Sequence, residues 1–352
     1  MKPSIWFREA IEDSRTGASR PWLWGLTFLL LLAAVCGWDI WSISRVSEGA
    51  SAFKSSGSSI WITDSITGID GRSCDALASS EGVGHSGAMA GTANTRLQIM
   101  PNTPVSTFRV TPGFAELIVG TDLAVTPGAL ISHDLAAEIH ATESATFESA
   151  IGPITFDEIY EYPSDGRLAS LQNAILIVDD EGATFDACWY EVWPFTETAA
   201  GIGIMTAEDP SVSKQSQLNS RNGIEFDLTA EVEGLKVWLL TCATLVVSGA
   251  MGWIATRSRR SELASALHST VARSDLSIII ALETLIWTLP ASMLAIGAST
   301  LATSLLPPGP VPISPASVGL VSAAVAGAVS GALLATLSVR SHRLFAYLRD
   351  RR

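Results

Sequence analysis

The sequence predicts an α-helical membrane protein with four transmembrane helices and a mixed α+β extracytoplasmic domain inserted between helices 1 and 2. The first observation is composition: of 352 residues, 47% are hydrophobic and only 16% are charged. The second is clustering, because the apolar residues gather in four windows of about 20 residues or more, the length that crosses a bilayer. The windows are residues 21–43, 235–255, 276–306 and 317–338. The third is the polar segment 44–234, which is long enough for one or two folded modules.

The distribution of charge predicts how these helices are oriented. Segment 44–234 holds 8 Lys and Arg against 27 Asp and Glu, whereas the rest of the chain holds 14 against 8. Cytoplasmic loops are enriched in Lys and Arg. We therefore expect a multi-pass protein of the bacterial plasma membrane. Both termini, the segment 256–275 and the basic tail 339–352 would be cytoplasmic, and the acidic domain and the loop 307–316 would lie outside.

The N-terminal region 1–20 predicts a helix that lies in the inner membrane interface. Within residues 4–14 one helical face is apolar, and it consists of Ile5, Trp6, Phe7, Ala10 and Ile11. A disordered leader is the alternative. The following window 21–43 has tryptophans at both ends, as membrane interfaces favour. Its apolar stretch is longer than that of a typical signal peptide, so we expect an uncleaved helix.

The segment 44–234 is expected to begin with a Ser/Gly-rich stalk at 47–59 and to end with a flexible polar return at 207–223. Ser132–His140 has a helical pattern with Ser132 as its N-cap. Short β-prone runs separated by turn residues predict strands at 60–63, 96–100, 105–110, 115–119, 174–178 and 187–193. Cys74 and Cys188 are the only cysteines in this domain, and disulfides persist outside the cytoplasm, so we expect them to be bonded.

Two features of the predicted membrane helices point to packing. Small residues recur every fourth position in the last window, at Gly319, Ala323, Gly327 and Gly331, which is typical of close helix contact. General tolerance of small residues in membranes is the alternative interpretation. Glu283 lies within the third window, where an ionisable group is costly unless it is paired. We expect it to be a structural anchor near the inner surface rather than a proton carrier. Pro290 is expected to kink the same helix.

No catalytic signature accompanies these features. None of the four lysines follows a glycine-rich phosphate loop, and no His-Glu-x-x-His pattern or zinc-type Cys/His spacing occurs. The sequence therefore predicts a non-catalytic chain without a cofactor, a metal or a nucleic-acid partner of its own.

The segment 257–290 reverses the chain between the second and third windows and is the predicted partner-binding element. It opens with Arg257, Arg259 and Arg260 and reaches its next cation at Arg273. Leu263 and Leu267 are four residues apart and would share a helical face that enters a groove on a partner. The candidate coupling residues are Arg257, Arg259, Arg260, Glu262, Leu263, Leu267 and Arg273.

This layout resembles FtsX-like and MacB-like ABC transporter permeases, which have one span, a large outer domain and three further spans. Arg259-Arg260-Ser261-Glu262-Leu263 is similar to the opening of their coupling segment, and Leu282-Glu283-Thr284-Leu285 to its end. Pro127-Gly128-Ala129-Leu130-Ile131-Ser132 with Leu135-Ala136 resembles a stretch of the MacB-type outer domain. The sequence departs from the family at His268-Ser269-Thr270, which replaces a glycine-containing turn.

The resemblance implies a permease subunit that couples ATP hydrolysis by a separate ATPase to movement of its extracytoplasmic domain. It implies a second permease subunit, identical or paralogous, and a cytoplasmic ABC ATPase dimer that binds ATP and Mg. Such a complex would export or extract a hydrophobic or peptide substrate by mechanotransmission. Two alternatives remain. One is an FtsX-like regulator of an extracellular cell-wall hydrolase, which would be an extracytoplasmic protein partner. The other is a sensor or adhesion protein without an ATPase.

Overall fold

The computed structural model describes residues 3–16, 20–120, 128–150, 152–179, 184–269, 271–306 and 316–339. It divides into two compact units. We call Met1–Gly49 with Leu228–Arg352 the helical unit, and Ala50–Asp227 the insert domain. Several expected features lie outside the described residues. They are the loop 307–316 except Ala316, the basic tail after Val339, Pro127 and Thr270.

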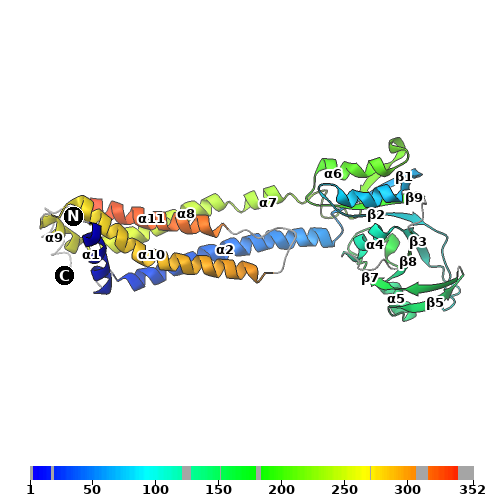
Figure 1. Ribbon diagram of the computed structural model, residues 1–352, viewed down its shortest axis with the longest axis horizontal. Helices are drawn as coiled ribbons and strands as arrows, with labels where there is room; N and C mark the ends of the chain where they lie inside the picture. Colours follow the sequence, from blue (N-terminus) through cyan, green and yellow to red (C-terminus); the bar gives the residue numbers. More distant parts are fainter. Residues whose placement is uncertain are drawn as a thin grey trace. The chain divides into compact units, whose positions relative to one another are not determined.

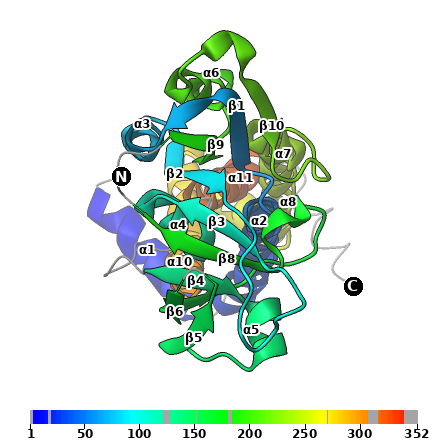
Figure 2. The ribbon, with the colours of Figure 1, turned by 90° about the vertical axis from the view of Figure 1, so that its right-hand side faces the viewer.

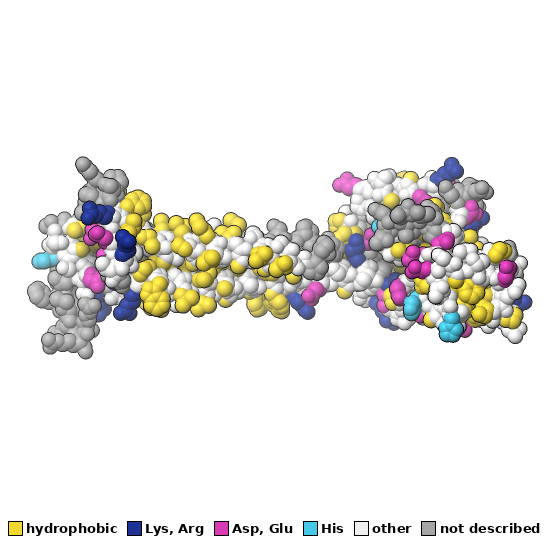
Figure 3. Space-filling model, turned by 60° about the horizontal axis from the view of Figure 1, so that its bottom comes forward, with side chains coloured by type: hydrophobic (Ala, Val, Ile, Leu, Met, Phe, Trp, Pro, Cys, Tyr) yellow, Lys and Arg dark blue, Asp and Glu magenta, His cyan; other side chains and the backbone are white. Residues whose placement is uncertain are grey.

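Among the described residues, the helical unit contains four helices that are long and apolar enough to cross a membrane, as the sequence predicts. They are α2 (Pro21–Ser55), α8 (Val237–Arg257), α10 (Arg273–Ser304) and α11 (Ser317–Ser338), and a short helix α7 (Leu228–Gly234) precedes α8. These long helices run alongside one another in Figure 1. Hydrophobic side chains cover their surface in Figure 3, as expected for helices in contact with lipid. Pro290 lies inside α10, which continues beyond it.

The interior of the helical unit is built from aromatic and small residues. Phe28 of α2 is fully buried and meets the Trp287 ring of α10 edge-on, with ring centroids 5.4 Å apart. Around this pair pack small side chains from α10 and α11, and they are Ala291, Ala295, Ala324 and Ala328. Because small side chains let helix backbones approach closely, dispersion contacts can hold these helices together where lipid removes the hydrophobic driving force.

Two short helices lie at one end of the helical unit. Helix α1 (Pro3–Arg15) precedes α2, and α9 (Arg260–His268) joins α8 to α10. The Trp6 indole N–H of α1 donates to Asp275 of α10 at 3.2 Å. Charged side chains gather at this end of the unit in Figure 3.

Helix α2 extends further than the sequence pattern suggests. The expected stalk 47–59 is helical as far as Ser55, where α2 ends. Val46, Ala50 and Phe53 are buried and recur at helical spacing, so one apolar face continues through the Ser/Gly-rich stretch. Most of the predicted stalk is therefore a continuation of α2, which the Ser/Gly-rich composition did not indicate.

The insert domain is built on an eight-stranded mixed sheet with the order β10-β1-β9-β2-β3-β8-β4-β7 (Figure 2). The pairs β3–β8 and β4–β7 are parallel, and the other neighbours are antiparallel. The strands are β1 (Ile60–Asp70), β2 (Val83–Gly91), β3 (Ser106–Val110), β4 (Ala129–Ser132), β7 (Glu158–Tyr160), β8 (Ala174–Val178), β9 (Thr184–Val192) and β10 (Lys214–Gln217). A separate hairpin pairs β5 (Ala145–Ser149) with β6 (Gly152–Phe156).

Short helices complete this domain. The α-helices are α3 (Gly71–Ala76), α4 (Pro112–Val119), α5 (His133–Ile139) and α6 (Glu197–Gly201), and the 3₁₀ turns are η1 (Leu77–Ser79), η2 (Ala169–Leu171), η3 (Ile202–Thr206) and η4 (Pro210–Val212). Phe114 of α4 and Trp189 of β9 are buried against each other, with ring centroids 5.2 Å apart. Their contact joins α4 to the centre of the sheet. The strands and helices together confirm a mixed α and β domain between the first two long helices.

Two predicted strands are absent from this fold. Residues 115–119 lie in helix α4, because Pro112 begins the helix and Gly120 ends it in the left-handed conformation, with φ of 78°. These two signals outweigh the β-propensity of the run between them. Residues 96–100 make only an isolated bridge, from Leu97 to Ser149, and then turn.

The expected flexible return 207–223 is largely structured. It contains η4 and the edge strand β10, whose Gln217 pairs with Trp61 of β1. The polar residues are accommodated because β10 lies at the edge of the sheet. Ser132 occupies the N-cap position of α5 as expected, but its hydroxyl does not cap the helix and instead accepts a hydrogen bond from the Ala174 amide at 3.3 Å.

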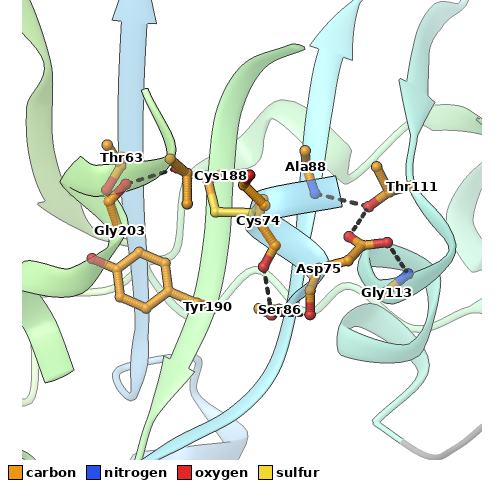
Figure 4. The surroundings of a disulfide bond; sticks show 12 residues. Thr63, Cys74, Asp75, Ser86, Ala88, Thr111, Gly113, Cys188, Tyr190 and Gly203 are labelled. Carbon is orange, nitrogen blue, oxygen red and sulfur yellow. Dashed lines mark hydrogen bonds between the residues drawn. A yellow bond between two sulfur atoms is a disulfide. The ribbon is translucent and has the colours of Figure 1, made fainter. Parts of the chain in front are cut away.

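The disulfide between Cys74 of α3 and Cys188 of β9 is confirmed (Figure 4). Both cysteines are fully buried. Beside them the carboxylate of Asp75 accepts hydrogen bonds from the Thr111 hydroxyl and the Gly113 amide. This network fixes the start of α4 next to the bond. Cys36 and Cys242, which lie in α2 and α8, are free cysteines.

Candidate functional site

Arg259 is the centre of a charged cluster that joins three helices of the helical unit. Its Nη1 donates to Glu283 Oε2 of α10 at 2.5 Å, and its Nη2 donates to Asp13 Oδ2 of α1 at 2.9 Å. Its Nε donates to Glu262 Oε2 of α9, also at 2.9 Å. The Arg259 side chain is only 12% exposed. One guanidinium therefore ties together α1, α9 and α10.

The local sequence explains why Arg259 can reach all three carboxylates. Helix α8 ends at Arg257, and two turn residues precede α9, so Arg259 lies where the chain reverses. Its backbone carbonyl accepts from the Glu262 amide at 3.0 Å, which places the two side chains one turn apart. Planar guanidinium presents several donors in a fixed fork, which suits several carboxylates at once.

The electrostatics of the cluster favour the charged form of Arg259. Burial alone would lower the pKa of its guanidinium, but the carboxylates of Glu283, Glu262 and Asp13 outweigh burial and raise the pKa above its usual value. The cluster places one cation against three carboxyl groups. Glu283 is 5% exposed, and within the described residues its Oε1 has no hydrogen-bond partner.

Glu283 is paired, as expected of an ionisable group within an apolar window. Its Oε2 is bonded to a guanidinium from the connecting segment rather than exposed to hydrocarbon. Since a buried carboxylate is costly without a counter-charge, this pairing fixes α10 to the start of α9.

The leucines of α9 face inward, which corrects their predicted role. Leu263 is 4% exposed and Ala264 is fully buried, and both pack with Leu276 and Ile280 of α10. Leu267 is half-buried against the same cluster. Leu263 therefore cannot extend into a groove on a partner, because the apolar face of α9 packs against the protein's own helices. The exposed face of α9 carries Ser265 and His268 instead.

The remaining basic residues of the segment do not join the ion pairs of Arg259. Arg257 is exposed and lies over the Trp253 ring, with its guanidinium carbon 5.6 Å from the ring centroid. Arg273 is exposed at the first position of α10, and Arg260 is half-buried at the first position of α9. The structure thus brings Arg259, Glu262 and Glu283 together, whereas Arg257 and Arg273 are exposed.

A pocket of about 360 Å³ opens beside this cluster. Its polar lining consists of Arg259 and four carboxyl groups, and its apolar lining comes from α9, α10 and the turn between them. The lining residues are Glu9, Asp13, Arg259, Glu262, Leu263, Ala266, Val271, Leu276, Ile279, Ile280 and Glu283. On the other side of Glu283 is a small cavity of about 20 Å³ that Thr256 and Thr284 also line.

Two of the four residues predicted to form the packing face of α11 are buried. Gly327 and Gly331 are buried, and a β-carbon at Gly331 would meet the backbone of α8. Gly319 is exposed with open space around it, and Ala323 is only half-buried. One turn of an α-helix takes 3.6 residues, so positions spaced by four drift gradually around the helix. The buried face therefore does not follow all four predicted positions. It continues through Leu320, Ala324 and Ala328.

Sequence reasoning missed three parts of this arrangement. The matching face of α8 consists of Thr244, Ser248, Gly252 and Thr256, whose spacing of four was a usable signal. Asp39 is 1% exposed in α2 and accepts from the Ala316 amide at 2.8 Å, just before α11 begins. An acid within an apolar window was likewise a signal. The sequence carries no signal for the role of Asp13, because its partner Arg259 is 246 residues away in the chain.

The described residues contain no group of three or more His, Cys, Asp and Glu side chains placed to hold a metal ion. Comparison of the sequence with protein-family models finds no match, and comparison with curated proteins finds no significant match. The contacts around Arg259 and the sequence pattern are therefore the basis for assigning a function.

Proposed function

We propose that this chain is the membrane subunit of an ABC-type complex in which a separate cytoplasmic ATPase moves the insert domain on the other side of the membrane. The observation that carries the proposal is the Arg259 cluster, which joins α1, α9 and α10 by ion pairs. A short helix between two spans, bonded to its neighbours in this way, suits an element that a partner pushes. The resemblance to FtsX-like and MacB-like permeases points the same way.

The contacts of α9 explain how a push would be transmitted. Leu263 and Ala264 pack on α10 and on the end of α11, and Arg259 adds an ion pair to Glu283. Close-packed interiors have low compressibility and transmit displacement. A force on the exposed face of α9 would therefore move the ends of α10 and α11 with it. Helix α2 is continuous from Pro21 to Ser55, and its last residues belong to the insert domain, so the same helix takes part in both units.

In this proposal the chain itself carries out no chemistry. ATP and Mg bind the partner, and the permease contributes movement. The charge distribution supports a cytoplasmic location for the Arg259 cluster, where an ATPase could reach it. A second permease subunit would complete the complex, and the cargo would be a hydrophobic or peptide substrate.

Copurification of the full chain from its native membrane tests the proposal. The wild type should bring down a chain with a phosphate-loop ATPase sequence. Changing the exposed face of α9 by Ser265→Glu with His268→Glu should abolish that binding, whereas Thr16→Glu, exposed at the end of α1, should preserve it. Equal insertion of all three proteins is checked first. Absence of any ATPase from the wild-type complex would exclude the proposal, and an additional secreted cell-wall hydrolase would favour the regulatory alternative.

A further inference from the structure

We infer that the pocket beside Arg259 receives a basic side chain, Lys or Arg, from the partner ATPase. This inference rests on the proposed function and specifies the chemistry of its docking site. The cation at the centre of the segment, Arg259, is 12% exposed and already bonded to three carboxylates of its own chain.

The charge of the pocket is the first reason. Glu9, Asp13, Glu262 and Glu283 line it, and Arg259 is the one cation among its described lining residues. The Glu262 side chain is 45% exposed, and Glu9 is exposed at the pocket and makes no ion pair among the described residues, so negative charge is accessible from outside. Like charges held close together repel one another, and an incoming cation would relieve that repulsion.

The burial and hydrogen bonding of Glu283 supply the second reason. Only 5% of this residue is exposed. Its Oε2 is bonded to Arg259, its Oε1 has no donor within the described part of the chain, and the Asp13 carboxyl interacts with it as a second acidic group. A buried acceptor without a donor is unfavourable, especially on a carboxylate. An ammonium group offers three donors and a guanidinium five, with no acceptor to be left unsatisfied. A cationic head is therefore the group that this lining favours.

The apolar lining selects the rest of the ligand. Leu276, Ile279 and Ile280 of α10 form one side of the pocket, and Leu263 and Ala266 of α9 form another. Lys and Arg bury aliphatic stems along apolar surfaces while their charged heads reach polar groups. A volume of about 360 Å³ is ample for one such side chain. An acidic or purely apolar side chain would match only one half of the lining.

Charge reversal at the rim of the pocket tests this inference in the full-length complex. Glu9→Lys should weaken ATPase copurification by roughly tenfold, because it places a like charge opposite the arriving cation. Glu12→Lys is the matched control, since Glu12 is exposed on the same helix but does not line the pocket. It should bind as the wild type does. Glu9→Gln should give an intermediate loss.

A photocrosslinking residue in place of Glu9 then identifies the occupant. Mass spectrometry of the crosslinked peptide should show an ATPase segment that contains Lys or Arg, and changing that residue to Glu should restore binding to Glu9→Lys. Full ATPase binding by Glu9→Lys would overturn the inference and leave the proposed function standing. A crosslink to residues 340–352 of this chain would also overturn it. If the wild type binds no ATPase, the proposed function fails and the inference fails with it.

Discussion

A β-carbon on Gly331 of α11 would lie 1.9 Å from the carbonyl oxygen of Gly249 of α8. The approach is reciprocal, since a β-carbon on Gly252 of α8 would lie 2.0 Å from the carbonyl oxygen of Ala328. The backbones of the two helices are therefore in direct contact, and no side chain larger than hydrogen fits between them at these positions. Such close approach is how apolar helices pack when lipid surrounds them.

Gly331→Leu should separate α8 from α11 and destabilise the protein by about 1–3 kcal/mol or more, the usual cost of overpacking. Thermal unfolding of the purified full chain in detergent measures the effect. Gly319→Leu is the matched control, because nothing lies within 4 Å of a β-carbon there. An equal loss in both variants would show that helix propensity or insertion, rather than the contact with α8, is responsible.

Arg259→Gln should destabilise the full chain by roughly 3–5 kcal/mol, because it leaves Glu283 buried without a counter-charge. Combining it with Glu283→Gln should recover part of the loss, since the uncompensated charge is then removed. Thermal unfolding of the two variants and the wild type gives both numbers. Arg257→Gln changes an exposed arginine two residues away and should alter stability by less than about 0.5 kcal/mol. Comparable losses at 257 and 259 would contradict the central role of Arg259.

Removing the disulfide by Cys74→Ala with Cys188→Ala should lower the free energy of unfolding by about 4–5 kcal/mol, because the bond closes a loop of 114 residues. Denaturant unfolding of the full chain measures this loss, and peptide mapping without reductant should recover the two cysteines joined. Recovery of both as free thiols from protein never exposed to reductant would contradict the pairing.

Acidification should loosen the turn that contains Asp165. A hydrogen bond from Arg167, 2.7 Å between Nη2 and Oδ2, holds the pKa of Asp165 below its usual value. A lowered native pKa means that the stabilisation is complete above about pH 4 and is lost as the pH falls through the native pKa. Hydrogen exchange of this segment should be faster in Asp165→Asn than in the wild type at neutral pH. The difference should shrink on acidification, and a constant difference would contradict the assignment.

The orientation deduced from charge can be tested with two single cysteines in a background that lacks the native four. Ser213 lies in the insert domain and Ser265 on α9. An impermeant thiol reagent should label position 213 and not position 265 in intact cells, and it should label both after lysis. Labelling of position 265 in intact cells would place the Arg259 cluster outside and exclude a cytoplasmic ATPase as its partner.

Local signals in the sequence account for much of the fold. The strand at 174–178 agrees with β8, and the four apolar windows agree with long helices, because a continuous apolar run constrains local structure strongly. The strand expected at 115–119 was wrong, although Pro112 and Gly120 were visible as helix signals. The edge strand β10 escaped notice because its residues are polar, and it exists only through pairing with β1.

The sequence by itself determined the four long helices, the mixed insert domain and the two cysteines that could pair. Composition, period and compartment chemistry are properties of short segments, so they can be inferred without coordinates. Only the tertiary structure decided which side chains meet across the chain. It turned Leu263 inward, shifted the packing face of α11 away from Gly319, and joined Arg259 to Asp13, from which 246 residues separate it. Such contacts depend on how helices rotate and pack against each other, which no single segment specifies.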